Sequence, residues 1–398
     1  MPPLIIHDAC VADGHSPSLR QATSLVIEGG HVTWMGPSEE VDTRRGEVLD
    51  AGGATVIPGM VDSHSHLTLP GGSHWIDRAS DPAPALIQVG HENADRLVRA
   101  GILTARDVGG VTGEDPVSGN VSPLNLVVRD ALRDRPQQPY IAAAGTWIAK
   151  RGYLPFVVGV DDGTGLVEAA MHQLDNGADF VKVMLDDVGA SKKSPFTESE
   201  MQKMCAAVHA RGSKVAAHST HHDGALVAAR AGVDSIEHGF ELDEQIASAM
   251  VANHVTLVST LSVIASWTTF QATTTIERFT SAKGRERTAR LWESATASIQ
   301  VARQAGVSIA AGSDFGGGSV RAGHLAWEVE LLVRAGLEPW EALGAATWRG
   351  GELLGRPASG SLEVGGPADL VLVHGDPLSD PAALWRVWAV FRHGERVS

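Results

Sequence analysis

Six side chains that could bind metal ions stand at or near the ends of apolar, strand-like segments scattered through the chain. The segments are VIPGMVDSHSH, DFVKVML, KVAAHS, DSIEHG and VSIAAGSD, and the side chains are those of His64, His66, Lys182, His218, His238 and Asp314. In an enzyme built as a barrel of parallel strands, the carboxyl ends of the strands meet at one rim and gather their side chains there. The set therefore indicates a hydrolytic site with two metal ions.

His64 and His66 are two residues apart, so in a strand their side chains point to the same side and could bind one metal ion. A His-x-His pair alone could equally be two surface histidines. Its position at the end of the apolar segment VIPGMVDSHSH favours metal binding.

Lys182 lies in Phe-Val-Lys-Val-Met, a run expected to be buried in a parallel strand. A buried, unpaired ammonium group is costly, so this lysine must be neutral, paired or modified. It could pair with Asp186. Reaction with carbon dioxide would instead give an anionic carbamate with two oxygens that can bridge two cations. Beside four histidines and an aspartate, the carbamate is favoured.

His218 and His238 end two consecutive predicted strands. One such histidine could be a hydrogen-bonded core residue, but two favour a ligand role. Asp314 follows Ala-Ala-Gly-Ser and precedes Phe-Gly-Gly-Gly, which argues against an aspartate that caps a helix. Its carboxylate could bind a metal and accept a proton from water.

The segments that must position these side chains alternate apolar strands with amphipathic helices over residues 58–358, which predicts a (β/α)₈ TIM-like barrel in an α/β protein. In four of the repeated units a Gly or Asn precedes the strand, as is typical of a helix C-terminus. Residues 1–57 and 359–398 are rich in short strands and turns, so we expect them to pair into a small composite β-sandwich. Residues 262–292 are a candidate lid.

Composition narrows the class of protein. The 398 residues carry a formal net charge of −15, which argues against nucleic-acid binding, and two cysteines imply no disulfide framework. No apolar run is long enough to span a membrane, and no secretory signal is evident. We expect a soluble, cytoplasmic protein that acts on a small molecule and could form a homo-oligomer.

The motifs resemble those of the metal-dependent amidohydrolase superfamily, in its imidazolonepropionase-related, prolidase-like branch. The matching stretches, in order, are VIPGMVDSHSHL, GILTARDVGG, VKVM, VDSIEHG, AGVSIAAGSD, PWEALGAAT and GSLEVGGPADLVLVHGDPL. The resemblance covers essentially the whole chain, and it too implies a TIM-like barrel with a composite β-sandwich.

The resemblance also implies a role for each candidate ligand. His64, His66 and Asp314 would bind the more buried metal ion, and His218 and His238 the more exposed one. Carboxylated Lys182 would bridge the two, and Asp314 would act as base toward a hydroxide held between them. The nitrogen-rich ligand set favours Zn²⁺ and leaves Mn²⁺ or Co²⁺ open.

Two departures from the branch concern the substrate. Trp147 to Tyr153 stand where many members have a Gly-Gly-His stretch, and Thr220 stands where many have His or Tyr. The tryptophans of the predicted rim loops could line an apolar pocket. The candidate substrate contacts are Arg151, or its neighbour Lys150, with Tyr153, His221 and His324, and the candidate pocket tryptophans are Trp75, Trp147 and Trp267.

We therefore expect hydrolysis of a carbon–nitrogen bond, an amide in an N-acyl amino acid, a dipeptide or a related small molecule. Lactone or ester hydrolysis by the same two metal ions is the alternative, because attack at a carbonyl is common to both. A mononuclear deaminase is disfavoured, since position 221 is His rather than the Glu common in those enzymes and Lys182 would have no role.

Overall fold

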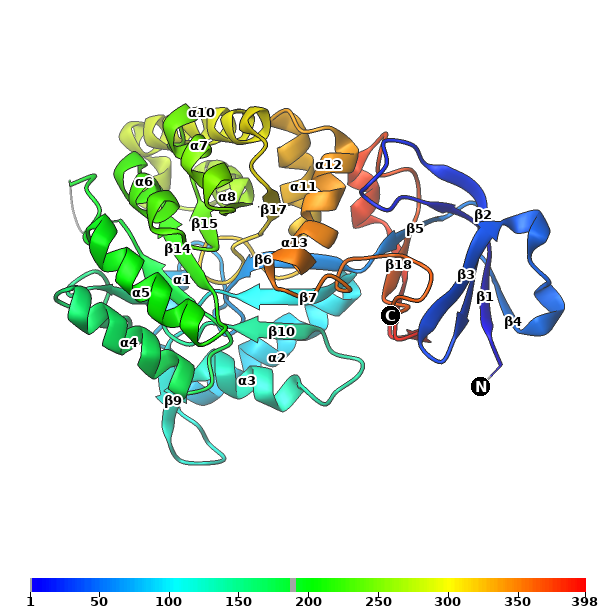
Figure 1. Cartoon of the computed structure of the whole chain (residues 1–398), viewed down its shortest axis with the longest axis horizontal. Coiled ribbons are helices and arrows are strands. Elements are labelled where there is room, and N and C mark those ends of the chain that lie inside the picture. The colour runs from blue at the N-terminus through cyan, green and yellow to red at the C-terminus, as the bar shows by residue number, and fades with distance from the viewer. Residues whose placement is uncertain (1, 187–190) are drawn as a thin grey trace.

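Parallel strands with helices packed around them form the larger part of the molecule (Figure 1). The computed structural model describes residues 2–186 and 191–398. One parallel sheet contains β6 (Met60–Ser65), β7 (Ile102–Asp107) and β10 (Tyr140–Ala143). The other contains, in spatial order, β12 (Val158–Val160), β11 (Ile148–Lys150), β13 (Val181–Met184), β14 (Val215–Ser219), β15 (Ser235–His238), β16 (Thr256–Ser259) and β17 (Ile309–Ala311).

Backbone hydrogen bonds connect the two parallel sheets at two places. After β17, the N–H of Asp314 donates to the carbonyl of His64 (2.8 Å), and the N–H of His66 donates to the carbonyl of Phe315 (2.9 Å). On the other side, the N–H of Asp179 donates to the carbonyl of Ala143 (2.8 Å). The first connection places Asp314, which follows β17, beside His64 in β6 and His66 just after it.

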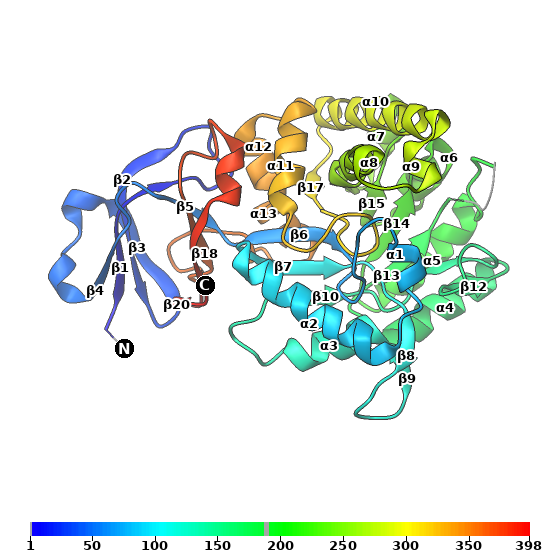
Figure 2. The ribbon, with the colours of Figure 1, turned by 180° about the vertical axis from the view of Figure 1, so that it is seen from behind.

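Helices cover the outside of the parallel strands, and their ends follow ordinary capping chemistry. Thr197 and Glu200 form a capping box at the start of α5, and Gly232 ends α6 in the left-handed conformation that glycine tolerates best. Figure 2 shows α2 and α3 beside β7 and β10. The helices are α1 (Trp75–Arg78), α2 (Ala83–Arg99), α3 (Leu124–Leu132), α4 (Gly163–Asp175), α5 (Glu198–Ala210), α6 (His222–Ala231), α7 (Glu244–Ala252), α8 (Leu261–Thr273), α9 (Glu277–Thr280), α10 (Ala282–Ala305), α11 (Leu325–Arg334), α12 (Pro339–Ala345) and α13 (Trp348–Leu353).

The two ends of the chain share one eight-stranded sheet, and both termini lie at that end of the molecule (Figure 1). Strand β18 pairs antiparallel with β5, with Leu370 opposite Pro58 and Val373 opposite Thr55. The sheet buries its own apolar cluster, which includes Leu25, Val56 and Leu370. Its strands are β1 (Leu4–Val11), β2 (Arg20–Glu28), β3 (His31–Pro37), β4 (Glu47–Asp50), β5 (Thr55–Pro58), β18 (Leu370–Val373), β19 (Val387–Arg392) and β20 (Glu395–Arg396).

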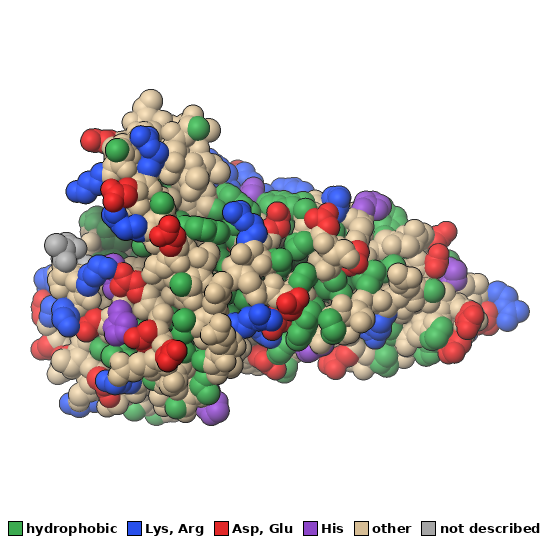
Figure 3. All heavy atoms as spheres, turned by 90° about the horizontal axis from the view of Figure 1, so that it is seen from above, with side chains coloured by type: hydrophobic (Ala, Val, Ile, Leu, Met, Phe, Trp, Pro, Cys, Tyr) green, Lys and Arg blue, Asp and Glu red, His purple; other side chains and the backbone are tan. Residues whose placement is uncertain are grey.

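The remaining elements are short. A hairpin of β8 (Thr112–Glu114) and β9 (Val121–Pro123) projects from the helical part, and the three 3₁₀ turns are η1 (Ser38–Glu40), η2 (Thr43–Arg45) and η3 (Pro381–Trp385). Within residues 2–186 and 191–398, no helix combines the length and apolar character needed to cross a membrane. Acidic and basic side chains are interspersed over the face seen in Figure 3.

Candidate metal centre

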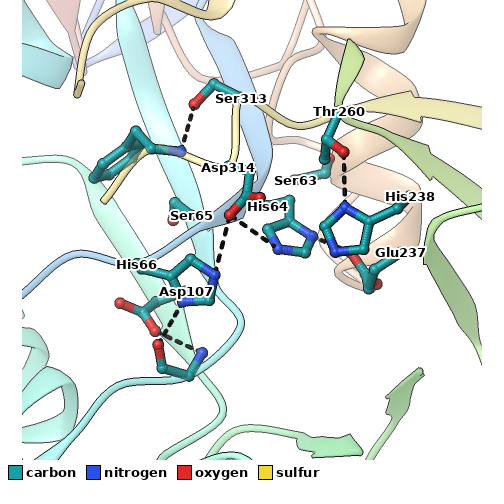
Figure 4. A network of polar contacts seen from close by, with 12 residues as sticks. Ser63, His64, Ser65, His66, Asp107, Glu237, His238, Thr260, Ser313 and Asp314 are labelled. Carbon is teal, nitrogen blue, oxygen red and sulfur yellow. Dashed lines mark hydrogen bonds and ion pairs between the residues drawn. The ribbon is translucent and has the colours of Figure 1, made fainter. Parts of the chain in front are cut away.

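Three of the predicted ligands form a compact, buried cluster (Figure 4). His64 and His66 come from the end of β6, and Asp314 follows β17. Oδ1 of Asp314 lies 3.2 Å from Nε2 of His66 and 3.5 Å from Nε2 of His64. One donor atom from each residue lies within 4.8 Å of the others, so the three could bind a single cation.

His218 and His238 extend this cluster from the ends of β14 and β15. Their ring centroids are 4.5 Å apart, and that of His238 is 4.8 Å from that of His64. His238 and Asp314 both have left-handed backbones, with φ of 73° and 50°. Such conformations are uncommon for residues other than glycine and are concentrated at functional sites, where the surrounding structure maintains them.

Lys182 lies in the same cavity as the histidines, and its side chain is buried. Among the residues that the structure describes, its Nζ atom has no hydrogen-bond partner. The expected alternative, a pair with Asp186, is not formed, because Asp186 contacts Nε2 of His218 (3.1 Å) and accepts from Oγ1 of Thr220 (2.6 Å). Burial lowers the pKa of Lys182 to about 8. A buried amine without a partner and with a lowered pKa favours the neutral form, which can react with carbon dioxide to give a carbamate that binds cations.

Hydrogen bonds at Nδ1 orient three of the imidazoles toward the cluster. Nδ1 of His66 donates to the carbonyl of Gly109 (2.6 Å), which leaves Nε2 as the free ring nitrogen. Nδ1 of His64 contacts Glu237, and Nδ1 of His238 contacts Oγ1 of Thr260 (2.8 Å). These contacts favour the tautomer whose Nε2 can bind a metal.

The surroundings set the protonation of His64 and the ring orientation of His218. Burial, followed by the charge of Lys182, lowers the pKa of His64 to about 4, so the ring is neutral at pH 7 and able to bind metal. His218 has the opposite orientation to the other three, since its Nε2 contacts Asp186. Its Nδ1 is therefore the nitrogen available for a ligand.

The sequence analysis missed Glu237 and Arg106, which support His64 from behind. Oε2 of Glu237 lies 2.6 Å from Nδ1 of His64, and its Oε1 accepts from Nη1 of Arg106 (2.9 Å) and from Oγ of Ser235 (2.5 Å). Burial alone would raise the pKa of Glu237, but Arg106 and Lys182 hold it well below its ordinary value. The available signal was a charged residue inside each of two apolar strands, ILTARD and DSIEHG.

Two further buried carboxylates anchor the loops that carry the ligands. Asp62 accepts from the N–H of Ser313 (2.9 Å) and from its Oγ (2.6 Å), next to Asp314. Asp107 accepts from the N–H of Leu67 (2.6 Å), just after His66. Each of these aspartates fixes the backbone beside a candidate ligand, which limits how far the ligand can move.

The cluster opens into a cavity of about 820 Å³, the solvent at its mouth included. Trp75, Trp147 and Trp267 line this cavity, as the sequence analysis expected, and so does Tyr153. The other apolar side chains in the wall are those of Leu154, Phe156, Val157, Met184, Phe240 and Val263.

The remaining candidate substrate residues lie outside this lining. Arg151 is exposed and forms an ion pair with Asp161 (2.8 Å). His221 is next to Glu241 (Nδ1 to Oε2, 3.5 Å), and His324 at the start of α11 has its Nδ1 3.0 Å from the carbonyl oxygen of Arg321. The structure therefore brings Tyr153 alone of these four to the cavity.

Thr220 and the candidate lid, which the sequence analysis also placed on the substrate side, can be located in the structure. Thr220, at one of the departures from the branch, lines the cavity and donates its hydroxyl to Asp186. The candidate lid at residues 262–292 forms most of α8, all of α9 and the first part of α10. Val263 and Trp267 on α8 belong to the cavity wall.

Residues 55–397 match the Amidohydrolase family, and the chain belongs to that family. Within it, the chain falls in the imidazolonepropionase and prolidase branch, as predicted. It is 28% identical to the imidazolonepropionase of Streptomyces griseus over 417 residues, which are 99% of this chain and 97% of that enzyme. It is 30% identical to an uncharacterized protein of Mycobacterium tuberculosis over 342 residues, 83% and 82% of the two chains.

A solved structure of a proposed prolidase from Bifidobacterium longum is similar throughout, with a TM-score of 0.83 and 26% identity over 99% of this chain and 94% of that one. These relationships and the cluster of metal-binding side chains define a hydrolase that acts on carbon–nitrogen bonds.

Proposed function

We propose that this chain is a binuclear metal-dependent hydrolase that cleaves the amide C–N bond of a small molecule, inside a (β/α)₈ barrel flanked by a composite β-sandwich. One observation carries the proposal most strongly. The amine of Lys182 is buried without a partner in the same cavity as four histidines and Asp314. An isolated ammonium is unstable in such a place, whereas a carbamate between two cations is not.

The residues present fit two metal ions. His64, His66 and Asp314 would hold one ion, and His218 with His238 would hold the other. Lys182, as a carbamate, would serve both. Imidazole and carboxylate donors suit Zn²⁺. When bound, the ions would polarise the scissile carbonyl and promote ionisation of the attacking water.

Asp314 has the properties of the proton carrier in this reaction. Although burial opposes ionisation, His64 and His66 hold the pKa of Asp314 below its ordinary value, so it is a carboxylate at neutral pH. It would accept the proton of the attacking water and deliver it to the leaving nitrogen. Its backbone is fixed by the hydrogen bond to the carbonyl of His64 and by the neighbouring Ser313.

The other groups position and protect the reaction. Glu237 accepts the Nδ1–H of His64 and keeps Nε2 directed to the cluster. The aromatic wall, including Trp147 and Phe240, restricts water around the carbonyl, which strengthens electrostatic interactions inside the cavity. Lactone or ester hydrolysis would use the same attack, and a mononuclear deaminase would need only part of the ligand set.

The experiment is a metal analysis combined with a substrate panel of amides, lactones, esters and deaminase substrates. We expect two divalent ions per chain and turnover of amides. Asp314→Asn should retain bound metal through the other five ligands and lose about 10²- to 10⁴-fold in kcat. A protein with one ion or none, or an Asp314→Asn variant with substantial activity, would refute the proposed mechanism. Preferred turnover of lactones would select the alternative.

A further inference from the structure

Apart from the ligand cluster, the cavity wall is almost entirely apolar. The segment 147–157 contributes Trp147, Leu154, Phe156 and Val157, and other elements add Trp75, Met184, Phe240, Val263 and Trp267. Several of these side chains pack on each other, with the rings of Trp147 and Phe156 5.6 Å apart. Such a wall favours flat aromatic or aliphatic groups and gives no compensation for a charge.

Outside the candidate metal centre, the described residues of the wall supply no cationic side chain for a carboxylate. A dipeptide or an N-acyl amino acid retains a carboxylate beside the bond to be cleaved, and proteins that bind such groups supply Arg, Lys or several N–H donors. Among the described residues that line the cavity, Lys182 is the single lysine and arginine is absent. Lys182 belongs to the ligand cluster, where its charge would be consumed on forming a carbamate.

Basic residues near the rim are engaged outside the cavity. Arg151, one of the candidate substrate contacts from the sequence, pairs with Asp161 and is exposed. Arg278 donates to the carbonyl of Ser73, and Arg321 donates to the carbonyl of Pro70. None of the three belongs to the cavity lining.

The polar groups in the wall are neutral, and two are already engaged. The hydroxyl of Thr220 donates to Asp186, and Nε1 of Trp267 donates to Oγ of Ser319 (3.0 Å). The hydroxyl of Tyr153 and the indole N–H groups of Trp75 and Trp147 are the other donors of the wall. Burial, with a smaller contribution from Asp186, raises the pKa of Tyr153, so the hydroxyl stays protonated at neutral pH. A neutral O–H donor suits a carbonyl or ether oxygen.

We infer that the substrate is an uncharged amide or carbamate with an aromatic or comparably apolar substituent, which contacts the tryptophans of the wall and accepts a hydrogen bond from Tyr153. The inference rests on the proposed function and narrows its substrate class. It departs from the expectation of an N-acyl amino acid or dipeptide, because both bring a carboxylate against a wall whose described residues, Lys182 apart, include no lysine or arginine.

A matched pair of ligands tests this inference directly. N-acetylphenethylamine and N-acetylphenylalanine have the same amide and the same ring and differ by one carboxylate. Quenching of tryptophan fluorescence reports binding, because three tryptophans line the cavity. We expect the neutral compound to bind at least tenfold more tightly to the metal-loaded protein, in which Lys182 is a carbamate, and to have the higher kcat/KM. Equal or tighter binding of the carboxylate compound would overturn the inference.

A charge placed in the wall should reverse the preference. Val157→Lys adds a cation to the lining, and Val157→Met is the neutral control of similar length. We expect Val157→Lys, and not Val157→Met, to bind N-acetylphenylalanine at least tenfold more tightly than the wild-type protein does. If Val157→Lys misfolds by circular dichroism, Leu154→Lys serves the same purpose. Failure to cleave any C–N bond in the panel would refute the proposed function, while the order of binding would still decide the inference.

Discussion

At the scale of single residues, the buried amine of Lys182 should make the stability of the metal-free protein depend on pH. The pKa of this group is about 8 in the folded protein against an ordinary value of 10.5, so below pH 8 the folded state must bury an ammonium. Between pH 8 and pH 10.5 the unfolded chain binds a proton at this site that the folded chain has released. The free energy of unfolding therefore rises with pH across that window, by about 3 kcal/mol from this group.

Lys182→Met removes the titrating group and keeps the length and apolar stem. In CO₂-free buffer without metal, we expect this variant to be at least as stable as the wild-type protein at pH 7 and to lose the rise between pH 8 and pH 10.5. Urea unfolding of both proteins at a series of pH values measures the difference. A variant that is several kcal/mol less stable at pH 7 would mean that the amine has a stabilising partner.

Glu237 positions His64 without facing the cavity, so we expect its replacement to weaken metal binding indirectly. Glu237→Gln removes the charge that fixes the His64 tautomer and leaves Arg106 without its buried partner. We expect metal affinity to fall about 10- to 100-fold and stability to fall by about 3–5 kcal/mol. Chelator competition and urea unfolding measure the two effects.

Variants of other residues separate these two effects. Arg106→Met combined with Glu237→Gln should recover most of the stability and little of the metal affinity, because the unpaired charge is gone and His64 is still unsupported. Glu241→Gln, a carboxylate beside His221 and Lys192, is the matched control and should bind metal as the wild-type protein does. Normal metal affinity in Glu237→Gln would show that His64 needs no support.

At the scale of elements, the loop after β17 must approach β6 very closely. A Cβ atom on Gly317 would lie 2.1 Å from Cδ2 of His66, so His66 or the loop would have to move. We expect Gly317→Ala to reduce kcat/KM about 10²-fold, the usual cost of a 1 Å displacement in a catalytic site. Gly165→Ala, whose Cβ would meet ordinary contacts at 3.5 Å or more, is the control. Full activity in Gly317→Ala would show that His66 tolerates displacement.

Part of this arrangement of elements could be predicted from the sequence. The strands with His64, His218 and His238 at or next to their ends were predictable, because a buried parallel strand has a continuous apolar run and the residues that close the run are visible in the sequence. The pairing of the chain ends was predictable from their shared texture. Neither inference requires knowing which residues, distant in the chain, contact each other.

The supporting contacts were not predictable, because they join residues far apart in the chain. Arg106 and Glu237 are 131 positions apart, and nothing in ILTARD or DSIEHG identifies one as the partner of the other. Arg151 is a different case, because its partner Asp161 is only ten positions away and engages a basic residue that the sequence analysis directed to the substrate. Charge alone does not say whether a side chain faces the cavity.

At the scale of the whole molecule, the shared sheet connects the chain termini to the candidate ligands, since β6 begins two residues after β5 ends. Val371 in β18 is fully buried and pairs with Ile57 of β5. Val371→Asp should lower the free energy of unfolding by at least about 3 kcal/mol, because it buries a carboxylate without a partner. Thermal and urea unfolding measure this loss.

The control for that prediction is Val364→Asp, because Val364 is 56% exposed and lies in the same part of the chain. Its stability should stay within about 0.5 kcal/mol of the wild-type value. Equal stability of the two variants would show that the pairing of β18 with β5 contributes little to the fold. Folded Val371→Asp protein with weakened metal binding would extend the connection from the sheet to His64.

The central claim is that a modified Lys182 joins two cations within one cavity. A crystal structure of the protein grown with zinc and bicarbonate tests it most directly. We predict two metal ions, one beside His64, His66 and Asp314 and one beside His218 and His238, with a carbamate on Nζ of Lys182 between them. An unmodified ammonium at Lys182, with no ion near it in crystals that contain bound metal, would contradict the account.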